Sequence, residues 1–164
     1  KQNDNSTQMK KEYTYDSALR RAAELCSAKE YCSFDIREKI RSWGISEKEV
    51  QKIIDYLKEE KYLDDNRFVR AYVKDKFRFN KWGKIKIAYS LRFKNIDNKL
   101  IDDALESIDI DDYKNTIFEI MKTKLKGLKY KDSYEAQAKL VRFATSHGFE
   151  PDFCFAVAKT LISD

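Results

Sequence analysis

A short pattern recurs three times in this sequence and divides most of the chain into similar stretches. Each copy pairs Gly or Asn, which tolerate a left-handed backbone, with an apolar residue and then a polar or acidic residue at or near a helix start; the copies are Gly44-Ile45-Ser46, Asn95-Ile96-Asp97 and Gly148-Phe149-Glu150. The apolar helical stretches that follow align without gaps, at offsets of 51 and then 53 residues, as in Val50, Ile101 and Cys154. This periodicity predicts a tandem repeat of helical units.

Each repeat unit is interpreted as three short helices. In the first unit, apolar residues at helical spacing begin at Tyr15, Ser33 is expected to cap the second helix, and Ser46 with Glu49 predicts a capping box for the third. Four Gly and one Pro are too few for a protein rich in tight turns. We therefore predict an all-α fold, with three tandem three-helix repeats forming an elongated, curved array: residues 15–62, 63–109 and 110–164, after a flexible polar tail of residues 1–14.

The middle repeat carries most of the excess positive charge. Residues 64–95 contain ten Lys and Arg and three Asp, a local net charge of +7 in a chain whose total is +5. Such a field attracts phosphates or an acidic protein surface. The predicted binding face contains cations that cannot all be buried, together with Trp82: Arg70, Lys74, Arg78, Lys81, Lys84, Lys86, Arg92 and Lys94.

Trp82 and Gly83 are expected at the turn between the first two helices of the middle repeat. Gly83 would permit the backbone turn, and Trp82 would supply a large anchor that either packs between helices or faces a partner. A second basic patch follows the middle repeat, and we interpret it as a solubilising or secondary contact surface: Lys122, Lys124, Lys126, Lys129 and Lys131.

Composition excludes several functional classes. Three cysteines without a CxxC pair, and the single His147, favour neither a disulfide framework nor a metal site, and they suit a reducing cytoplasm. No apolar run is long enough to span a membrane. We expect no enzyme activity, because no nucleophile–base pair or Gly-rich phosphate loop is evident. The acidic residues between Asp102 and Asp112 are more typical of a solvated helix face and a helix cap than of a cation site.

The residues around the start of the middle repeat resemble a known family, the RecX regulators of the RecA recombinase. The resemblance lies in Tyr62-Leu63-Asp64-Asp65, Arg67-Phe68, Tyr72-Val73 and Lys81-Trp82-Gly83, followed by Ile87, Leu91 and Lys94. It covers about residues 15–162, and its specific part runs from Leu63 to Lys94. Asn95 stands where the family commonly has Gly, but Asn also tolerates the left-handed conformation.

The resemblance implies a regulator that binds RecA, chiefly as its filament on DNA, by lodging an elongated body in the filament groove. It implies suppression of ATP hydrolysis and strand exchange in homologous recombination, DNA repair and the SOS response, with no catalytic residues and no cofactor. The expected partners are the RecA filament and, weakly and without sequence specificity, single- or double-stranded DNA. The protein is expected to be a cytoplasmic monomer that binds no membrane.

The motif residues are expected to be mainly structural, with Asp64 or Asp65 capping the first helix of the middle repeat. This motif set is Tyr62, Leu63, Asp64, Asp65, Arg67, Phe68, Tyr72 and Gly83.

A second hypothesis remains open, in which the chain is a non-specific DNA-binding helical module that acts without RecA. Its affinity for bare DNA would fall by roughly 0.9 log units per log unit of salt for each phosphate neutralised. No homeodomain, zinc-finger or basic-zipper signature accompanies the charge, so reading of base sequence is not expected.

Overall fold

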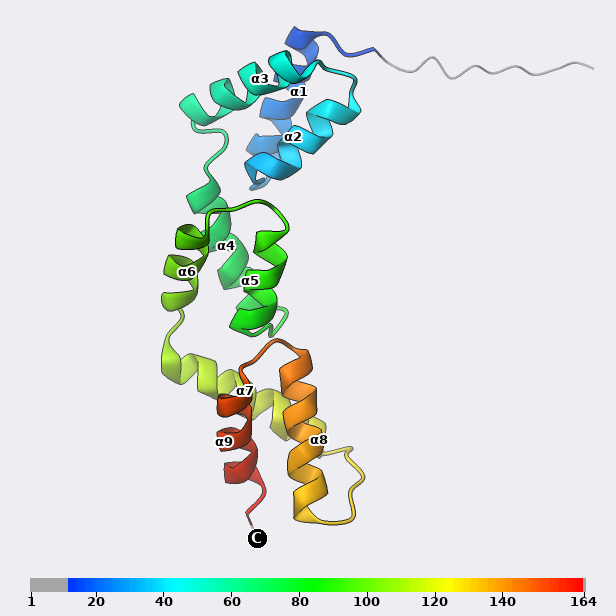
Figure 1. Ribbon diagram of the computed structural model, residues 1–164, viewed down its shortest axis with the longest axis vertical. Helices are drawn as coiled ribbons and strands as arrows, with labels where there is room; N and C mark the ends of the chain where they lie inside the picture. Colours follow the sequence, from blue (N-terminus) through cyan, green and yellow to red (C-terminus); the bar gives the residue numbers. More distant parts are fainter. Residues whose placement is uncertain (1–11, 164) are drawn as a thin grey trace, which may run out of the picture. The chain divides into compact units, whose positions relative to one another are not determined.

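The computed structural model describes residues 12–163, and within that range the chain forms nine α-helices and no strand (Figure 1). The all-α prediction is confirmed. The chain divides into two compact units, one ending at Asp65 and one beginning at Asn66. The helices are α1 (Tyr15–Ala28), α2 (Ser33–Ser42), α3 (Glu47–Glu59), α4 (Asp65–Arg78), α5 (Lys84–Arg92), α6 (Asn98–Glu106), α7 (Ile110–Leu125), α8 (Ser133–Ser146) and α9 (Pro151–Leu161).

Side-chain caps determine where several helices begin. Ser46 caps α3, because its hydroxyl oxygen accepts a hydrogen bond from the Glu49 N–H at 3.4 Å, which is one of the two bonds of the predicted capping box. The structure differs at α2, where Cys32 rather than Ser33 is the N-cap. Its Sγ accepts a hydrogen bond from the Asp35 N–H at 3.5 Å, and Ser33 is the first helical residue. Ser33 lies one residue inside the helix, where its hydroxyl donates to the Asp65 carboxylate.

Tyr13 and Thr14 belong to the first compact unit and not to the predicted flexible tail. The Tyr13 ring stacks on Trp43, with the centroids 4.7 Å apart. The Thr14 hydroxyl accepts from the Ser17 N–H at 3.2 Å while the Ser17 hydroxyl accepts from the Thr14 N–H at 2.9 Å, which is a complete capping box for α1. The remainder of the predicted tail, residues 1–11, lies outside the described residues.

The three copies of the recurring pattern adopt the same backbone conformation. The φ angle is 83° at Gly44, 52° at Asn95 and 92° at Gly148, so each copy begins with a left-handed residue. The apolar residue that follows is buried in every copy: Ile45, Ile96 and Phe149. Each copy therefore ends one helix and turns the chain into the next, as the sequence predicts.

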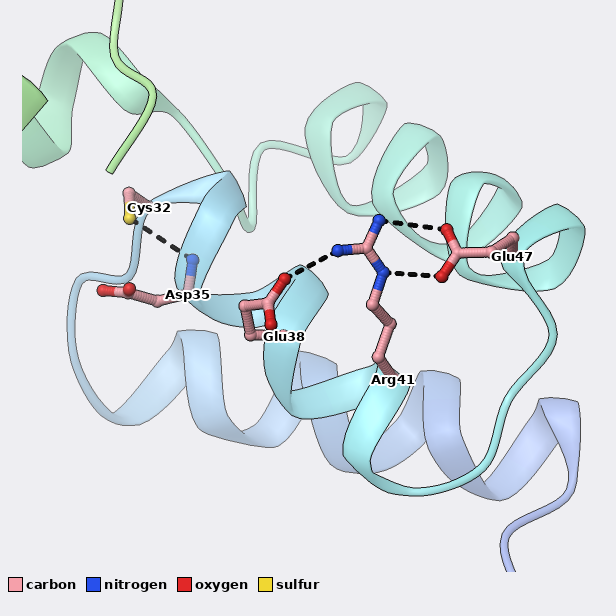
Figure 2. Close-up of polar contacts among 5 residues, drawn as sticks. All are labelled: Cys32, Asp35, Glu38, Arg41 and Glu47. Atoms are coloured by element: carbon pink, nitrogen blue, oxygen red, sulfur yellow. Dashed lines mark hydrogen bonds and ion pairs between the residues drawn. The ribbon is translucent and has the colours of Figure 1, made fainter. Parts of the chain in front are cut away.

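The first compact unit packs α1, α2 and α3 around one apolar core, which includes Ile36, Ile40 and Ile53. Arg41 joins two of these helices at their polar edge (Figure 2). Its Nε and Nη2 donate to the two carboxylate oxygens of Glu47 at 2.6 and 3.0 Å, and its Nη1 donates to Glu38 at 2.6 Å. The hydrogen bonds from Arg41 hold the pKa of Glu47 below its usual range.

The second compact unit contains the rest of α4 together with α5 to α9. Within it α5 packs on α6, and α7 packs on both α8 and α9. Two sets of aligned core positions are buried in every copy, whereas Ile108, Val157 and Leu161 of other aligned sets are half-buried. Val50, Ile101 and Cys154 are fully buried, and so are Ile36, Ile87 and Leu140. The predicted boundary between residues 109 and 110 falls inside this unit, so the division into three repeats remains a prediction from sequence pattern.

Candidate partner-binding surface

Three cations form an exposed ridge along α4. Arg70, Lys74 and Arg78 lie four residues apart on the helix and therefore share one face, and we call them the α4 ridge. They line a hollow of about 330 Å³ together with Val73, Phe77, Ser107, Ile108, Asp109 and Asp112. Asp109 caps α7 by accepting from the Asp112 N–H at 2.9 Å. The ridge therefore lies beside the acidic start of α7, which offsets part of its positive charge.

The lysines around Trp82 are placed differently, because they cover aromatic rings. The ammonium groups of Lys76 and Lys86 lie 4.9 and 4.5 Å from the Trp82 ring centroid. The Lys84 ammonium lies 5.0 Å from the Tyr113 ring, and that of Lys94 lies 6.0 Å from the Phe68 ring. Each such cation–π contact stabilises by about 0.5–1 kcal/mol at an exposed site.

The predicted binding face thus separates into two groups. Arg70, Lys74, Arg78, Lys81 and Arg92 are exposed, whereas Trp82, Lys84, Lys86 and Lys94 are half-buried. The exposed group offers free cationic heads to a partner. The half-buried group packs with aromatic side chains, and its lysines keep their charge at the surface while their stems cover apolar area.

A backbone junction joins the start of α5 to the turn between α8 and α9. The Gly83 N–H donates to the His147 carbonyl at 2.8 Å, and the Ile85 N–H donates to the Gly148 carbonyl at 3.0 Å. Gly83 has φ −79° and ψ 168°, which any residue can adopt, so it is not needed for the turn as predicted. It is needed for close approach, because a Cβ at this position would lie 2.3 Å from the Gly148 carbonyl carbon and oxygen.

Tyr113 completes this junction from α7. Its hydroxyl accepts a hydrogen bond from the Lys84 N–H at 3.0 Å and donates one to Glu150. Burial, and then the hydrogen bond to Glu150, raise the pKa of Tyr113 far above its ordinary value. Burial likewise raises the pKa of the nearby Cys154 thiol to about 11. This junction is not predictable from the sequence, because no local pattern links Tyr113 to Gly83.

An apolar stripe is exposed on α5, on the opposite side from its buried residues. Ile85, Tyr89 and the following Phe93 are 53%, 62% and 66% exposed, and they recur every four residues. The Tyr89 and Phe93 rings meet edge to face, with the centroids 5.1 Å apart. We call these three residues the α5 stripe. Ile87 and Leu91 recur at the same spacing on the other side of the helix, and they are buried, as the repeat alignment predicts.

The described residues contain no group of three or more His, Cys, Asp and Glu side chains placed to hold a metal ion. Between residues 12 and 163, no helix is both long and apolar enough to cross a membrane.

Comparison with known proteins identifies the middle of the chain. Residues 64–105 match the family model described as RecX, second three-helix domain. The chain is 32% identical over 132 residues to the regulatory protein RecX of Clostridium perfringens strain 13, and 35% identical over 130 residues to that of Clostridium botulinum strain Eklund 17B. The chain belongs to the RecX family. The matches cover 79% and 78% of this chain, and 61% and 60% of the two RecX relatives, so the chain spans about three fifths of their length.

Two crystal structures of RecX proteins share the fold of this chain. That of RecX from Lactobacillus salivarius superposes with a TM-score of 0.78 at 19% identity, covering 90% of this chain and 96% of that one. A second structure of a regulatory protein RecX also gives a TM-score of 0.78, at 21% identity, covering 92% of this chain and 73% of that one. At these identities the likeness establishes the fold of this RecX family member.

The RecX motif residues lie mostly in packed or hydrogen-bonded positions. Leu63 and Phe68 are buried, Tyr62 packs against the core of the first unit, and Arg67 is half-buried. The Tyr72 hydroxyl and the Ser90 hydroxyl are hydrogen-bonded at 2.5 Å, which ties α4 to α5. These side chains contribute to packing and to hydrogen bonds within the units, and the mainly structural role of the motif remains a prediction.

The two acidic residues of the RecX motif, Asp64 and Asp65, lie in different surroundings. Asp64 is exposed at the residue before α4. The Asp65 carboxylate accepts hydrogen bonds from the Ser33 N–H at 2.8 Å and the Ser33 hydroxyl at 3.1 Å. Asp65 therefore satisfies a backbone donor at the start of α2, a long-range contact that the sequence analysis does not predict.

Proposed function

We propose that this chain regulates the RecA recombinase by binding the RecA–DNA filament and suppressing its ATP hydrolysis and strand exchange, in homologous recombination, DNA repair and the SOS response. The observation that carries the proposal is the RecX second three-helix domain at residues 64–105. The α4 ridge supports it, because an exposed row of cations suits the acidic protein surfaces and phosphates of a nucleoprotein filament.

The suppression of hydrolysis follows from preferential binding. A protein that binds one arrangement of the filament subunits more tightly than another shifts the population toward the first arrangement. Any step that requires the other arrangement then becomes slower. The proposed regulator therefore needs a contact surface and not catalytic groups of its own, and we propose that it acts as a monomer without a cofactor.

DNA contributes a second, weaker attraction in this proposal. The exposed cations Arg70, Lys74, Arg78 and Arg92 can approach phosphates, and this attraction is screened over about 8–10 Å at physiological salt. We place the activity in the cytoplasm, since Cys26, Cys32 and Cys154 are buried thiols, as suits a reducing compartment.

The proposal is tested by titrating the chain into the cognate RecA on single-stranded DNA while ATP hydrolysis is measured. Binding to the same DNA without RecA is followed at the same salt concentration. We expect hydrolysis to fall at chain concentrations that leave bare DNA mostly unbound. Unchanged hydrolysis together with tight, salt-sensitive DNA binding would instead support the DNA-binding module that acts without RecA.

A matched pair of double variants tests the α4 ridge. Lys74→Glu with Arg78→Glu reverses two exposed cations four residues apart, and Lys48→Glu with Lys52→Glu makes the same charge change on an exposed face of α3. We expect the first pair to raise the concentration for half-suppression about tenfold and the second pair to change it less than about twofold, because loss of a specific charge contact exceeds a loss of net charge. Equal effects would remove the ridge from the mechanism.

A further inference from the structure

A second hollow lies along α7, on a surface that the proposed function leaves unassigned. Its volume is about 610 Å³, and we call it the α7 groove. The side chains that matter for its chemistry are Lys81, Glu119, Ile120, Thr123, Lys124 and Phe143. Lys81 comes from the segment between α4 and α5, and Lys124 from the last turn of α7. The structure thus brings the basic middle segment and the second lysine patch to one groove.

Apolar side chains are available on the wall of the α7 groove. Ile120 and Phe143 are both half-buried and reach it from α7 and α8. The Phe143 ring packs edge-on against His147, with centroids 4.7 Å apart, and the Lys124 ammonium lies 5.1 Å from its centre. Phe143 is therefore held in place before any partner arrives, which lowers the entropy lost on binding.

Positive charge surrounds the end of the α7 groove. Residues 124–131 contain four lysines and no acidic residue, and all four lysines are exposed. The Lys131 N–H donates to Glu135 at 2.8 Å, and the Lys139 ammonium donates to the Lys129 carbonyl at 2.7 Å, so the lysine-rich loop is tied to α8. The rim is thus both cationic and anchored, and a negatively charged partner complements it.

We propose that the α7 groove binds an acidic protein segment that places one apolar side chain against Ile120 and Phe143 and its carboxylates beside Lys81 and Lys124. That the segment belongs to the recombinase rests on the proposed function. Nucleic acid fits the groove less well. Glu119 repels phosphates, and a nucleic-acid backbone has no N–H group that could donate to the Glu119 carboxylate. In a peptide complex Glu119 can instead accept a backbone N–H.

Single charge reversals test the proposal, with a matched control in the same helix. Lys124→Glu and Lys81→Glu alter the groove. Lys122→Glu makes the same charge change two residues before Lys124, at an exposed lysine outside the groove. In the RecA hydrolysis titration we expect the two groove variants to raise the half-suppressing concentration about fivefold or more, and Lys122→Glu less than about twofold. Circular dichroism and thermal unfolding confirm that each variant is folded.

Binding of a deoxythymidine oligonucleotide by the same variants separates protein from nucleic acid. We expect the groove variants to bind it as Lys122→Glu does. A selective loss of oligonucleotide binding in Lys124→Glu and Lys81→Glu would overturn the proposal in favour of a phosphate site. Equal suppression of hydrolysis by Lys124→Glu and Lys122→Glu would also overturn it.

A direct titration keeps this inference distinguishable from the proposed function. The wild-type chain is titrated with a short peptide of Asp and Glu around a central leucine, and with the same peptide carrying serine at the centre, while the NMR resonances of Ile120 and Phe143 are followed. We expect saturable shifts with the leucine peptide and much smaller shifts with the serine peptide. If the leucine peptide shifts these resonances but the wild-type chain leaves RecA hydrolysis unchanged, only the recombinase role is refuted. Equal responses to both peptides would refute the apolar anchor.

Discussion

The Cα of Gly83 lies directly against the backbone of Gly148, so that no side chain fits between the two residues. A Cβ on Gly83 would lie 2.3 Å from the carbonyl carbon and oxygen of Gly148, and a Cβ on Gly148 would lie 2.3 Å from the Cβ of Lys86. Real Cβ atoms are not found at such distances, so substitution of either glycine forces two backbones apart. This close approach makes possible the hydrogen bonds from Gly83 to His147 and from Ile85 to Gly148.

The four glycines should therefore differ strongly in their tolerance of alanine. Gly83→Ala and Gly148→Ala are expected to lower the free energy of unfolding of the second unit by about 2–5 kcal/mol, through overpacking and lost hydrogen bonds. Gly44→Ala meets open space but keeps a φ of +83°, and it should cost the first unit about 1–2 kcal/mol. Gly127→Ala has neither constraint and should change stability by less than about 0.5 kcal/mol.

Urea unfolding can measure the glycine series one unit at a time, because each unit contains one tryptophan. Trp43 reports on the first unit and Trp82 on the second, so Trp43→Phe or Trp82→Phe backgrounds isolate each signal. Similar losses for Gly83→Ala and Gly127→Ala would contradict the close approach.

Tyr113 should make the second unit sensitive to alkaline pH. Its pKa in the folded chain is raised above the ordinary value of 10.0, so its stabilisation is complete below pH 10 and is lost as pH rises toward the folded pKa. In Tyr113→Phe the Lys84 N–H and Glu150 lose their partner, which should cost about 1–3 kcal/mol at neutral pH. When the free energy of unfolding is measured from pH 8 to 11, the difference between wild type and Tyr113→Phe should shrink above pH 10. If the free energies of unfolding of the wild-type and Tyr113→Phe proteins changed with pH in parallel, the predicted link between Tyr113 ionisation and stability would be excluded.

Asp65 should stabilise the first unit through its two bonds to Ser33. Asp65→Ala is expected to lower the free energy of unfolding by about 1–3 kcal/mol, since the Ser33 N–H loses a charged acceptor. A double-mutant cycle with Ser33→Ala, which removes the hydroxyl donor alone, isolates the hydroxyl–carboxylate contact. Purely additive losses would show that the two side chains do not interact.

The α5 stripe should contribute to partner binding more than to stability. Tyr89→Ser with Phe93→Ser removes two exposed rings and their mutual contact, so the free energy of unfolding should fall by less than about 1.5 kcal/mol. The concentration for half-suppression of RecA hydrolysis should rise about tenfold, because exposed aromatic clusters often dominate interfaces. Tyr134→Ser removes another highly exposed ring, on α8, and serves as the control. Wild-type suppression by the double variant would assign the stripe no role in binding the filament.

Local signals account for the parts of the structure that the sequence predicts well. The left-handed turns at Gly44, Asn95 and Gly148 depend on the residue type at one position, and the cores after them depend on a period of 3.6 residues. Even so, a purely local reading assigns the cap of α2 to Ser33. In the structure Cys32 is the cap, and Ser33 is the first helical residue, whose N–H and hydroxyl both donate to the distant Asp65.

The candidate surface was only partly predictable, for the same reason. The count of charges between residues 64 and 95 shows that several cations must be exposed, but it does not show which ones. Lys84 and Lys94 cover aromatic rings of α7 and α4, and Lys86 covers the nearby Trp82, whereas Arg70, Lys74 and Arg78 remain exposed. Lys81 reaches the α7 groove because the junction at Gly83 brings its segment close to α7 and α8.

The sequence by itself determined the helical class, the positions of the three turns, the buried faces and the family, because each depends on residue types at short and regular spacing. Only the tertiary structure decided the contact between Gly83 and Gly148, the hydrogen bonds of Tyr113, and the meeting of Lys81 with Lys124 at one groove. These depend on how helices distant in sequence approach each other. Their geometry is set by the packing of whole side chains, and no local pattern encodes it.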